Sequence, residues 1–186
     1  MKMRLKRLTR NTGRRQFSRS TTMQVAAVCY RRNELSVEFL LVNTSAGKWT
    51  FPKGRIAPEM LPYEAAEQEA LEEAGAIGTI EETCLGHYMD LKRMLGHDNR
   101  SREILVAAYL LEVETMSVPQ EPRRNPTWFT PDEAKQRLTE QRAPKHSGEI
   151  ARIVDAAEIM IQRSALGPPP SQELRSFYAG SFRNRH

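Results

Sequence analysis

The chain has 186 residues, of which 39% are hydrophobic, enough for one folded domain with appended segments. Its longest apolar run, Ile104–Leu111, is far shorter than the roughly 20 residues of a membrane-spanning helix, which argues against a membrane protein. The net charge of +5 comes from the start of the chain. The first twenty residues carry eight basic and no acidic side chains, which leaves 20 basic against 23 acidic residues elsewhere.

Both ends of the chain differ in composition from the middle. Residues 1–21 form a basic arm without the apolar stretch of a secretory signal, and we expect it to be flexible. Nucleic acid is the alternative partner of such a charge run, but it is not favoured. Residues 167–186 form a Pro-led polar tail, so the predicted domain spans 22–166. Cys29 and Cys84 lack the spacing of a zinc site and are expected to be buried thiols in a reducing cytoplasm.

Hydrophobic periodicity predicts alternating strands and helices between these ends. In chain order they are strands 24–31, 37–42 and 49–51, a helix over 62–74, strands 80–90, 103–113 and 127–130, a helix from 131 and a final helix over 147–164. Thr130, Pro131 and Glu133 have the N-cap, N1 and N3 residue types that start a helix. We see one core and no repeat, which indicates a single α/β (α+β) domain.

The helix expected over 62–74 carries an unusual set of charges. At 100° per residue, Glu69, Glu72 and Glu73 fall on one side, while Ala66, Ala70 and Ala74 belong to a separate apolar stripe. Like charges at these spacings cost roughly 0.2–0.5 kcal/mol per pair, and the segment from Pro58 to Gly75 has no Lys or Arg. A solvated acidic face and a site for a hard divalent cation both fit this pattern. We expect the Glu73 carboxylate to lie away from the alanine stripe.

The sequence around this helix resembles the Nudix box. Trp-Thr-Phe-Pro-Lys-Gly leads into the helix, and Gly54, Glu69, Glu72, Glu73 and Gly75 match the box in register. Two positions depart from the pattern, because Met60 stands where the first Glu belongs and Gln68 where the Arg belongs. The wider resemblance, to the diphosphoinositol polyphosphate and diadenosine polyphosphate hydrolases, covers roughly residues 22–138.

This resemblance implies an α/β/α sandwich with a mixed central sheet and a metal-dependent pyrophosphohydrolase. Glu69, Glu73 and a carbonyl of Lys53 or Gly54 would hold Mg²⁺, with Mn²⁺ as the second candidate. Glu72 would be the general base or a further ligand. Divalent metals suit phosphoanhydride hydrolysis because they neutralise phosphate oxygens and activate water.

The expected substrate is a small molecule with a phosphoanhydride, either nucleoside-linked or polyphosphorylated. Lys53 and Arg55 flank the box, and a basic loop after residue 90 supplies Arg100 and Arg102. Thr44 and Ser45 match a phosphate-contacting turn of the diphosphoinositol branch. These six residues are the predicted substrate-binding set: Lys53, Arg55, Thr44, Ser45, Arg100 and Arg102. Because of Met60 and Gln68, a catalytically impaired Nudix-fold module that senses a ligand or binds RNA remains the alternative.

Overall fold

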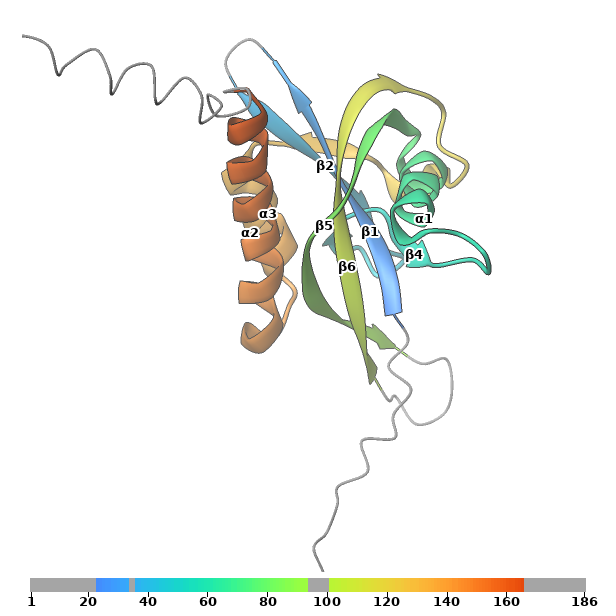
Figure 1. Cartoon of the computed structure of the whole chain (residues 1–186). Coiled ribbons are helices and arrows are strands. Elements are labelled where there is room, and N and C mark those ends of the chain that lie inside the picture. The colour runs from blue at the N-terminus through green and yellow to red at the C-terminus, as the bar shows by residue number, and fades with distance from the viewer. Residues whose placement is uncertain (1–22, 34–35, 94–100, 166–186) are drawn as a thin grey trace, which may run out of the picture.

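A seven-stranded mixed sheet forms the centre of the computed structural model, which describes residues 23–33, 36–93 and 101–165 (Figure 1). The main path of the sheet runs β3 (Trp49–Thr50), β2 (Val37–Asn43), β1 (Met23–Arg32), β6 (Ser101–Met116), β5 (Ala76–Arg93). In addition, β4 (Lys53–Arg55) pairs with β1 and β7 (Thr127–Phe129) pairs with β2. β1 and β6 are parallel, and the other pairings are antiparallel.

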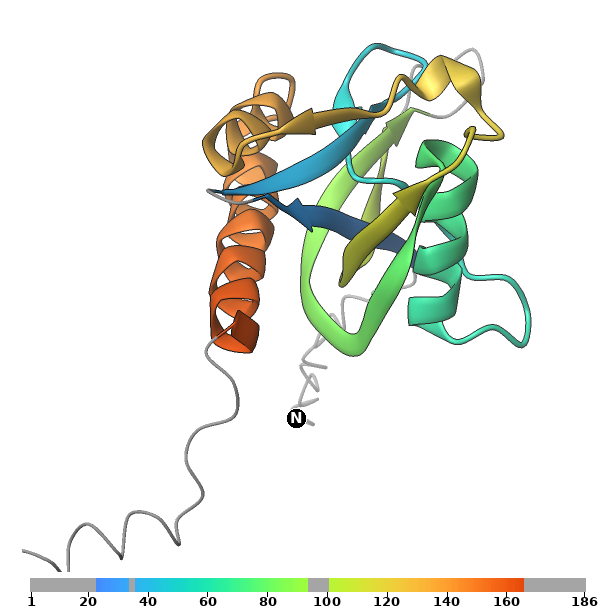
Figure 2. The same cartoon turned by 90° about the horizontal axis from the view of Figure 1, so that it is seen from above.

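Helices cover both faces of the sheet, as Figures 1 and 2 show. β1 is buried on both sides, and its residues alternate between two cores. Ala26, Val28 and Tyr30 pack with α2 (Pro131–Thr139) and α3 (Pro144–Ala165). Val25, Ala27 and Cys29 pack with the alanines of α1 (Pro62–Glu69) and its continuation. The predicted α/β/α sandwich with a mixed sheet is therefore confirmed.

The β5–β6 hairpin is longer than the hydrophobic pattern indicates. Its strands extend beyond the predicted 80–90 and 103–113, because the backbone ladder continues at both ends past the hydrophobic runs. The register shifts after Ile77, Ile80 and Cys84, which are irregularities of the kind that bend a strand. α3 is fixed to this hairpin where the Glu149 carboxylate accepts a hydrogen bond from the Met89 amide at 2.8 Å.

Local sequence signals account for several helix ends. Thr130 caps α2 as predicted, by accepting the Glu133 amide, while the Glu133 carboxylate accepts the Thr130 amide at 3.0 Å. α3 begins at Pro144, three residues before the predicted start, since proline suits the first turn. Cys29 and Cys84 are both free thiols. Within the described ranges, no helix has the length and apolar character needed to cross a membrane.

Candidate active site

The acidic helix changes its winding at the predicted site. α1 ends at Glu69 and continues as a π-helical turn, η1 (Ala70–Ala74), which ends at Gly75 in the left-handed conformation at φ 70°. Single π turns inside helices are frequently found at functional sites. The predicted alanine stripe is confirmed, because Ala66, Ala70 and Ala74 are fully buried against the sheet.

Glu73 is buried, so the alternative of a solvated acidic face does not hold at this position. Only 3% of the residue is exposed. Its Oε2 accepts the backbone N–H of Lys53 at 3.1 Å, and its Oε1 forms an ion pair with the guanidinium of Arg124. Burial raises the pKa of Glu73, although Arg124 and the Lys53 amide act in the opposite direction. The carboxylate is thus held from two sides.

Glu69 lies against the backbone of β4, where Gly54 leaves room for it. A Cβ at position 54 would overlap the Glu69 carboxylate, so only glycine allows this approach. Burial, followed by the charges of Glu73 and Glu72, raises the pKa of Glu69 to about 7. A carboxyl group with this pKa is half protonated at neutral pH, and a bound cation would favour its charged form.

The segment after β6 is attached to the end of the acidic helix and brings two further charged residues to the site. The amides of Gln120 and Glu121 both donate to the Glu72 carbonyl, at 3.0 and 3.2 Å. The 3₁₀ turn η2 (Pro122–Arg124) follows, and Arg124 Nε lies 2.6 Å from Glu121 Oε2. Glu121 contributes to the raised pKa values of Glu69 and Glu73.

Arg124 and Glu121 were missed by the sequence interpretation. The stretch around them is Pro-rich and basic, and nothing in its spacing links it to a helix fifty residues earlier. The sequence offered one signal, which was the absence of the arginine of the box, because Gln68 stands at that position. Gln68 donates to Glu72 Oε1 at 2.6 Å, while Arg124 supplies the positive charge from another part of the chain.

The donor chemistry of this site fits a hard divalent cation, since its side chains offer carboxylate oxygens. Among the residues described, no three Asp, Glu, His or Cys side chains are arranged to hold a metal ion. Glu73 is instead paired with a guanidinium, which neutralises a carboxylate as a metal would. The room that Gly54 leaves for Glu69, and the raised pKa of that side chain, are consistent with an oxygen-ligated cation.

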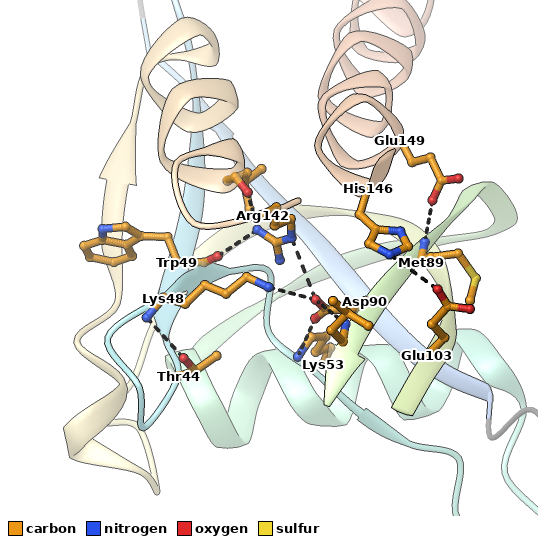
Figure 3. Close-up of polar contacts among 12 residues, drawn as sticks. Thr44, Lys48, Trp49, Lys53, Met89, Asp90, Glu103, Arg142, His146 and Glu149 are labelled. Carbon is orange, nitrogen blue, oxygen red and sulfur yellow. Dashed lines mark hydrogen bonds and ion pairs between the residues drawn. The ribbon is translucent and has the colours of Figure 1, made fainter. Parts of the chain in front are cut away.

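A second polar cluster lies beside the acidic site and is shown in Figure 3. The Asp90 carboxylate on β5 faces three cations: Lys48 Nζ at 3.0 Å, Lys53 Nζ at 3.4 Å and Arg142 Nε at 3.8 Å. Burial alone would raise the pKa of Asp90, but the three cations outweigh it and hold the pKa below its ordinary value. Of these four residues, the sequence interpretation had selected only Lys53.

The other predicted substrate-binding residues take different places. Thr44 is part of a turn in which its Oγ1 accepts the Lys48 amide at 3.1 Å, and Ser45 is exposed at the same turn. Arg55 is exposed on β4. Arg102 is half-buried on β6 and pairs in register with position 92, two residues beyond the Asp90 pair. Arg100 lies outside the described residues.

Comparison with known proteins identifies the family. The model of the NUDIX domain matches residues 21–152, so the chain belongs to the Nudix family. This confirms the predicted Nudix pyrophosphohydrolase at the level of the family. Among curated protein sequences, none matches closely enough to count as a relative.

Solved structures share the fold at low sequence identity. An Ap4A hydrolase from C. elegans in a binary complex is 22% identical, with a TM-score of 0.54 over 76% of this chain and 98% of that one. A NUDIX hydrolase from Nitrosomonas europaea is 20% identical, with a TM-score of 0.53 over 74% and 88%. The NUDIX domain of Shewanella oneidensis NrtR, complexed with ADP ribose, is 15% identical, with a TM-score of 0.55 over 77% and 90%. At these identities the likeness establishes the fold alone.

Proposed function

We propose that this protein is a metal-dependent hydrolase that cleaves a phosphoanhydride in a nucleoside-linked or polyphosphorylated small molecule. The observation that carries the proposal is the pair Glu69 and Glu73, four residues apart at the end of the acidic helix and each in contact with the Lys53–Gly54 backbone of β4. One carboxylate is fixed by the Lys53 amide and Arg124, and the other lies in the space left by Gly54. Two ionised carboxylates this near to each other destabilise the folded state unless a positive charge balances them. Because the chain belongs to the Nudix family, a divalent cation is the expected partner.

Glu69 and Glu73 would hold Mg²⁺ or Mn²⁺, with a backbone carbonyl at Gly54 as a further oxygen ligand. A divalent cation in such a site would neutralise phosphate oxygens and lower the pKa of a water molecule. Glu72 is half-buried and hydrogen-bonded to Gln68, and it remains our candidate for the group that takes the proton from water. Glu121 is the second candidate, because it is exposed and lies on the segment attached to the Glu72 carbonyl.

The departures from the box do not by themselves imply loss of activity. Arg124 provides the charge that Gln68 lacks. Met60 packs against the core with the alanine face of the helix, so an apolar residue suits that position. The ligand-sensing alternative keeps one supporting observation, since a NUDIX domain of similar fold was solved with ADP ribose bound. Binding of a ligand without turnover would favour it.

The same proposal includes a polyphosphate substrate and a cytoplasmic location, which we infer from the cysteines. It gives the basic arm only a secondary role. For the substrate, Lys53, Arg55, Thr44, Ser45, Arg100 and Arg102 remain the predicted binding set.

A substrate panel with and without Mg²⁺ tests the function. Diadenosine polyphosphates, ADP-ribose, nucleoside triphosphates and diphosphoinositol phosphates should be compared by phosphate or nucleotide release. We expect turnover of at least one class that requires Mg²⁺ and falls by about 10²–10⁴-fold in Glu69→Gln. Glu67→Gln is the matched control, because Glu67 is an exposed carboxylate on the same helix. Activity that survives EDTA, or that is equal in both variants, would contradict the metal mechanism.

A further inference from the structure

The cluster around Asp90 has more positive charge than its single carboxylate can balance. Lys48, Lys53 and Arg142 surround it, so the four side chains together carry a surplus of two positive charges. The three cations come from separate parts of the chain: the turn before β3, strand β4 and the connection between α2 and α3 (Figure 3). The fold therefore assembles this surplus, since no local sequence run creates it.

Water can screen this surplus only weakly. The exposed fraction of the side chain is 18% for Lys48, 14% for Lys53 and 2% for Arg142. Arg142 donates through Nη1 to the carbonyls of Trp49 and Leu138, but its buried Nε and Nη2 have no hydrogen-bond acceptor among the described residues. Burial, followed by the charge of Arg142, lowers the pKa of Lys48. Buried cations are normally paired, and these three share one carboxylate, so the cluster has the charge and the donors to bind a further anionic group.

Another lysine of the same chain shows what a purely structural ion-pair cluster looks like. Lys135 on α2 lies within 3.5 Å of carboxylate oxygens of Asp132, Asp155 and Glu158. Asp155 and Glu158 raise the pKa of Lys135, although burial opposes them. Lys135 thus has three anions around one cation, whereas Asp90 has three cations around one anion.

Lys53 joins the cationic cluster to the acidic site. Its backbone amide donates to Glu73, and its ammonium group faces Asp90, so the two sites are separated by the length of one lysine side chain. A reacting phosphate at the glutamates would place the next phosphates of a chain beside the cations. Lysine binds phosphate as a point charge and arginine binds it through two parallel donors.

We propose that Lys48, together with Lys53 and Arg142, forms a subsite for the non-reacting phosphates of a substrate that contains a chain of three or more. Asp90 is a positioning residue that keeps the three cations together. The Thr44 turn fixes the backbone of Lys48. This inference rests on the proposed function for its account of the substrate, but binding at the subsite requires neither turnover nor a metal.

The test is binding of inorganic tripolyphosphate to the full-length protein in the presence of EDTA. Binding is measured by calorimetry and by the shift in the thermal unfolding temperature. We expect binding by the wild type and a loss of affinity of about tenfold or more in Lys48→Met, because hydrogen bonds to charged groups are among the stronger ones. Lys48→Arg should retain most of the affinity. Lys135→Met is the control and should bind as the wild type does. Inorganic monophosphate should bind more weakly, and adenosine triphosphate should show the same dependence on Lys48 if the phosphate chain is what is recognised.

Unfolding without ligand gives the second readout. Lys48→Met removes a cation from a repulsive cluster and should unfold at or above the wild-type temperature, whereas Lys135→Met should unfold at a lower temperature. Equal tripolyphosphate affinity in the wild type and Lys48→Met, or no binding by the wild type, would overturn the subsite. So would a destabilised Lys48→Met whose ligand affinity is unchanged. Binding that depends on Lys48 without hydrolysis of any phosphoanhydride would instead refute the proposed function and leave the subsite standing.

Discussion

Replacing Glu69 by Gln should stabilise the metal-free protein at neutral and alkaline pH. Burial raises the pKa of Glu69, and the charges of three neighbouring carboxylates, Glu73, Glu72 and Glu121, raise it further. An ionised Glu69 is therefore unfavourable in the folded state until a cation binds. Glutamine keeps the shape of the side chain and removes the charge, so the variant should lose this unfavourable contribution.

The size of the effect follows from the pKa of Glu69, which rises from 4.5 to about 7 on folding. One pKa unit corresponds to about 1.4 kcal/mol, which sets an upper limit of about 3–4 kcal/mol. Because the side chain is only half-buried, solvent screening reduces the expected gain to about 1–2 kcal/mol. The folded state holds the proton more tightly than the unfolded state, so wild-type stability should fall as the pH rises from 4.5 through 7.

Urea denaturation in EDTA at several pH values between 4 and 8.5 measures this dependence. The Glu69→Gln profile should be flatter than that of the wild type and should lie above it from about pH 7. Glu67→Gln, which changes an exposed carboxylate on the same helix, should keep the wild-type slope. If Glu69→Gln and the wild type lose stability in parallel over this range, an ionised Glu69 is not unfavourable in the folded state and the reasoning is wrong.

Three further changes test other contacts. Glu73→Gln should lower the free energy of unfolding by about 1–2 kcal/mol in urea denaturation, because it leaves the partly buried Arg124 guanidinium without this partner, and that loss outweighs the burial that raises the pKa of Glu73; a gain in stability would contradict this. Gly54→Ala should displace Glu69 and abolish the rise in melting temperature that the proposed metal site predicts on addition of Mg²⁺, whereas Gly148→Ala, where a Cβ meets no atom within 4 Å, should not. Asp90→Asn should cost about 3–5 kcal/mol by thermal or urea unfolding, because it leaves the three surrounding cations without a counter-charge. Since the pKa of Asp90 is depressed, its contribution to the free energy of unfolding is present above about pH 4 and is lost as the pH falls below it. In a plot of stability against pH, Asp90→Asn should therefore lose less stability than the wild type at acidic pH.

Sequence patterns were sufficient wherever a residue acts through its near neighbours. The spacing of Ala66, Ala70 and Ala74 predicted the buried face of the acidic helix, because helical period alone decides which side chains share a face. Gly75 ends that helix in the left-handed conformation, as its residue type indicates. Thr130 caps α2 through bonds that span three residues. The box residues, and hence the family, could be found in the same way because they lie in one continuous segment.

Only the tertiary structure decided which distant side chains complete each site. Glu73 and Glu69 belong to the same acidic pattern, yet Glu73 is buried because the Lys53 amide of β4 and Arg124 of η2 both contact its carboxylate. η2 is held there by the bonds of Gln120 and Glu121 to the Glu72 carbonyl. Lys48, Asp90 and Arg142 are far apart in the chain and have ordinary surface residue types, so nothing in their spacing marks them. They meet because the turn before β3, strand β5 and the connection between α2 and α3 converge beside β4. Ion pairs between residues that are far apart in the sequence can be identified only from the tertiary structure, because the folded sheet is what brings their charges close enough to interact.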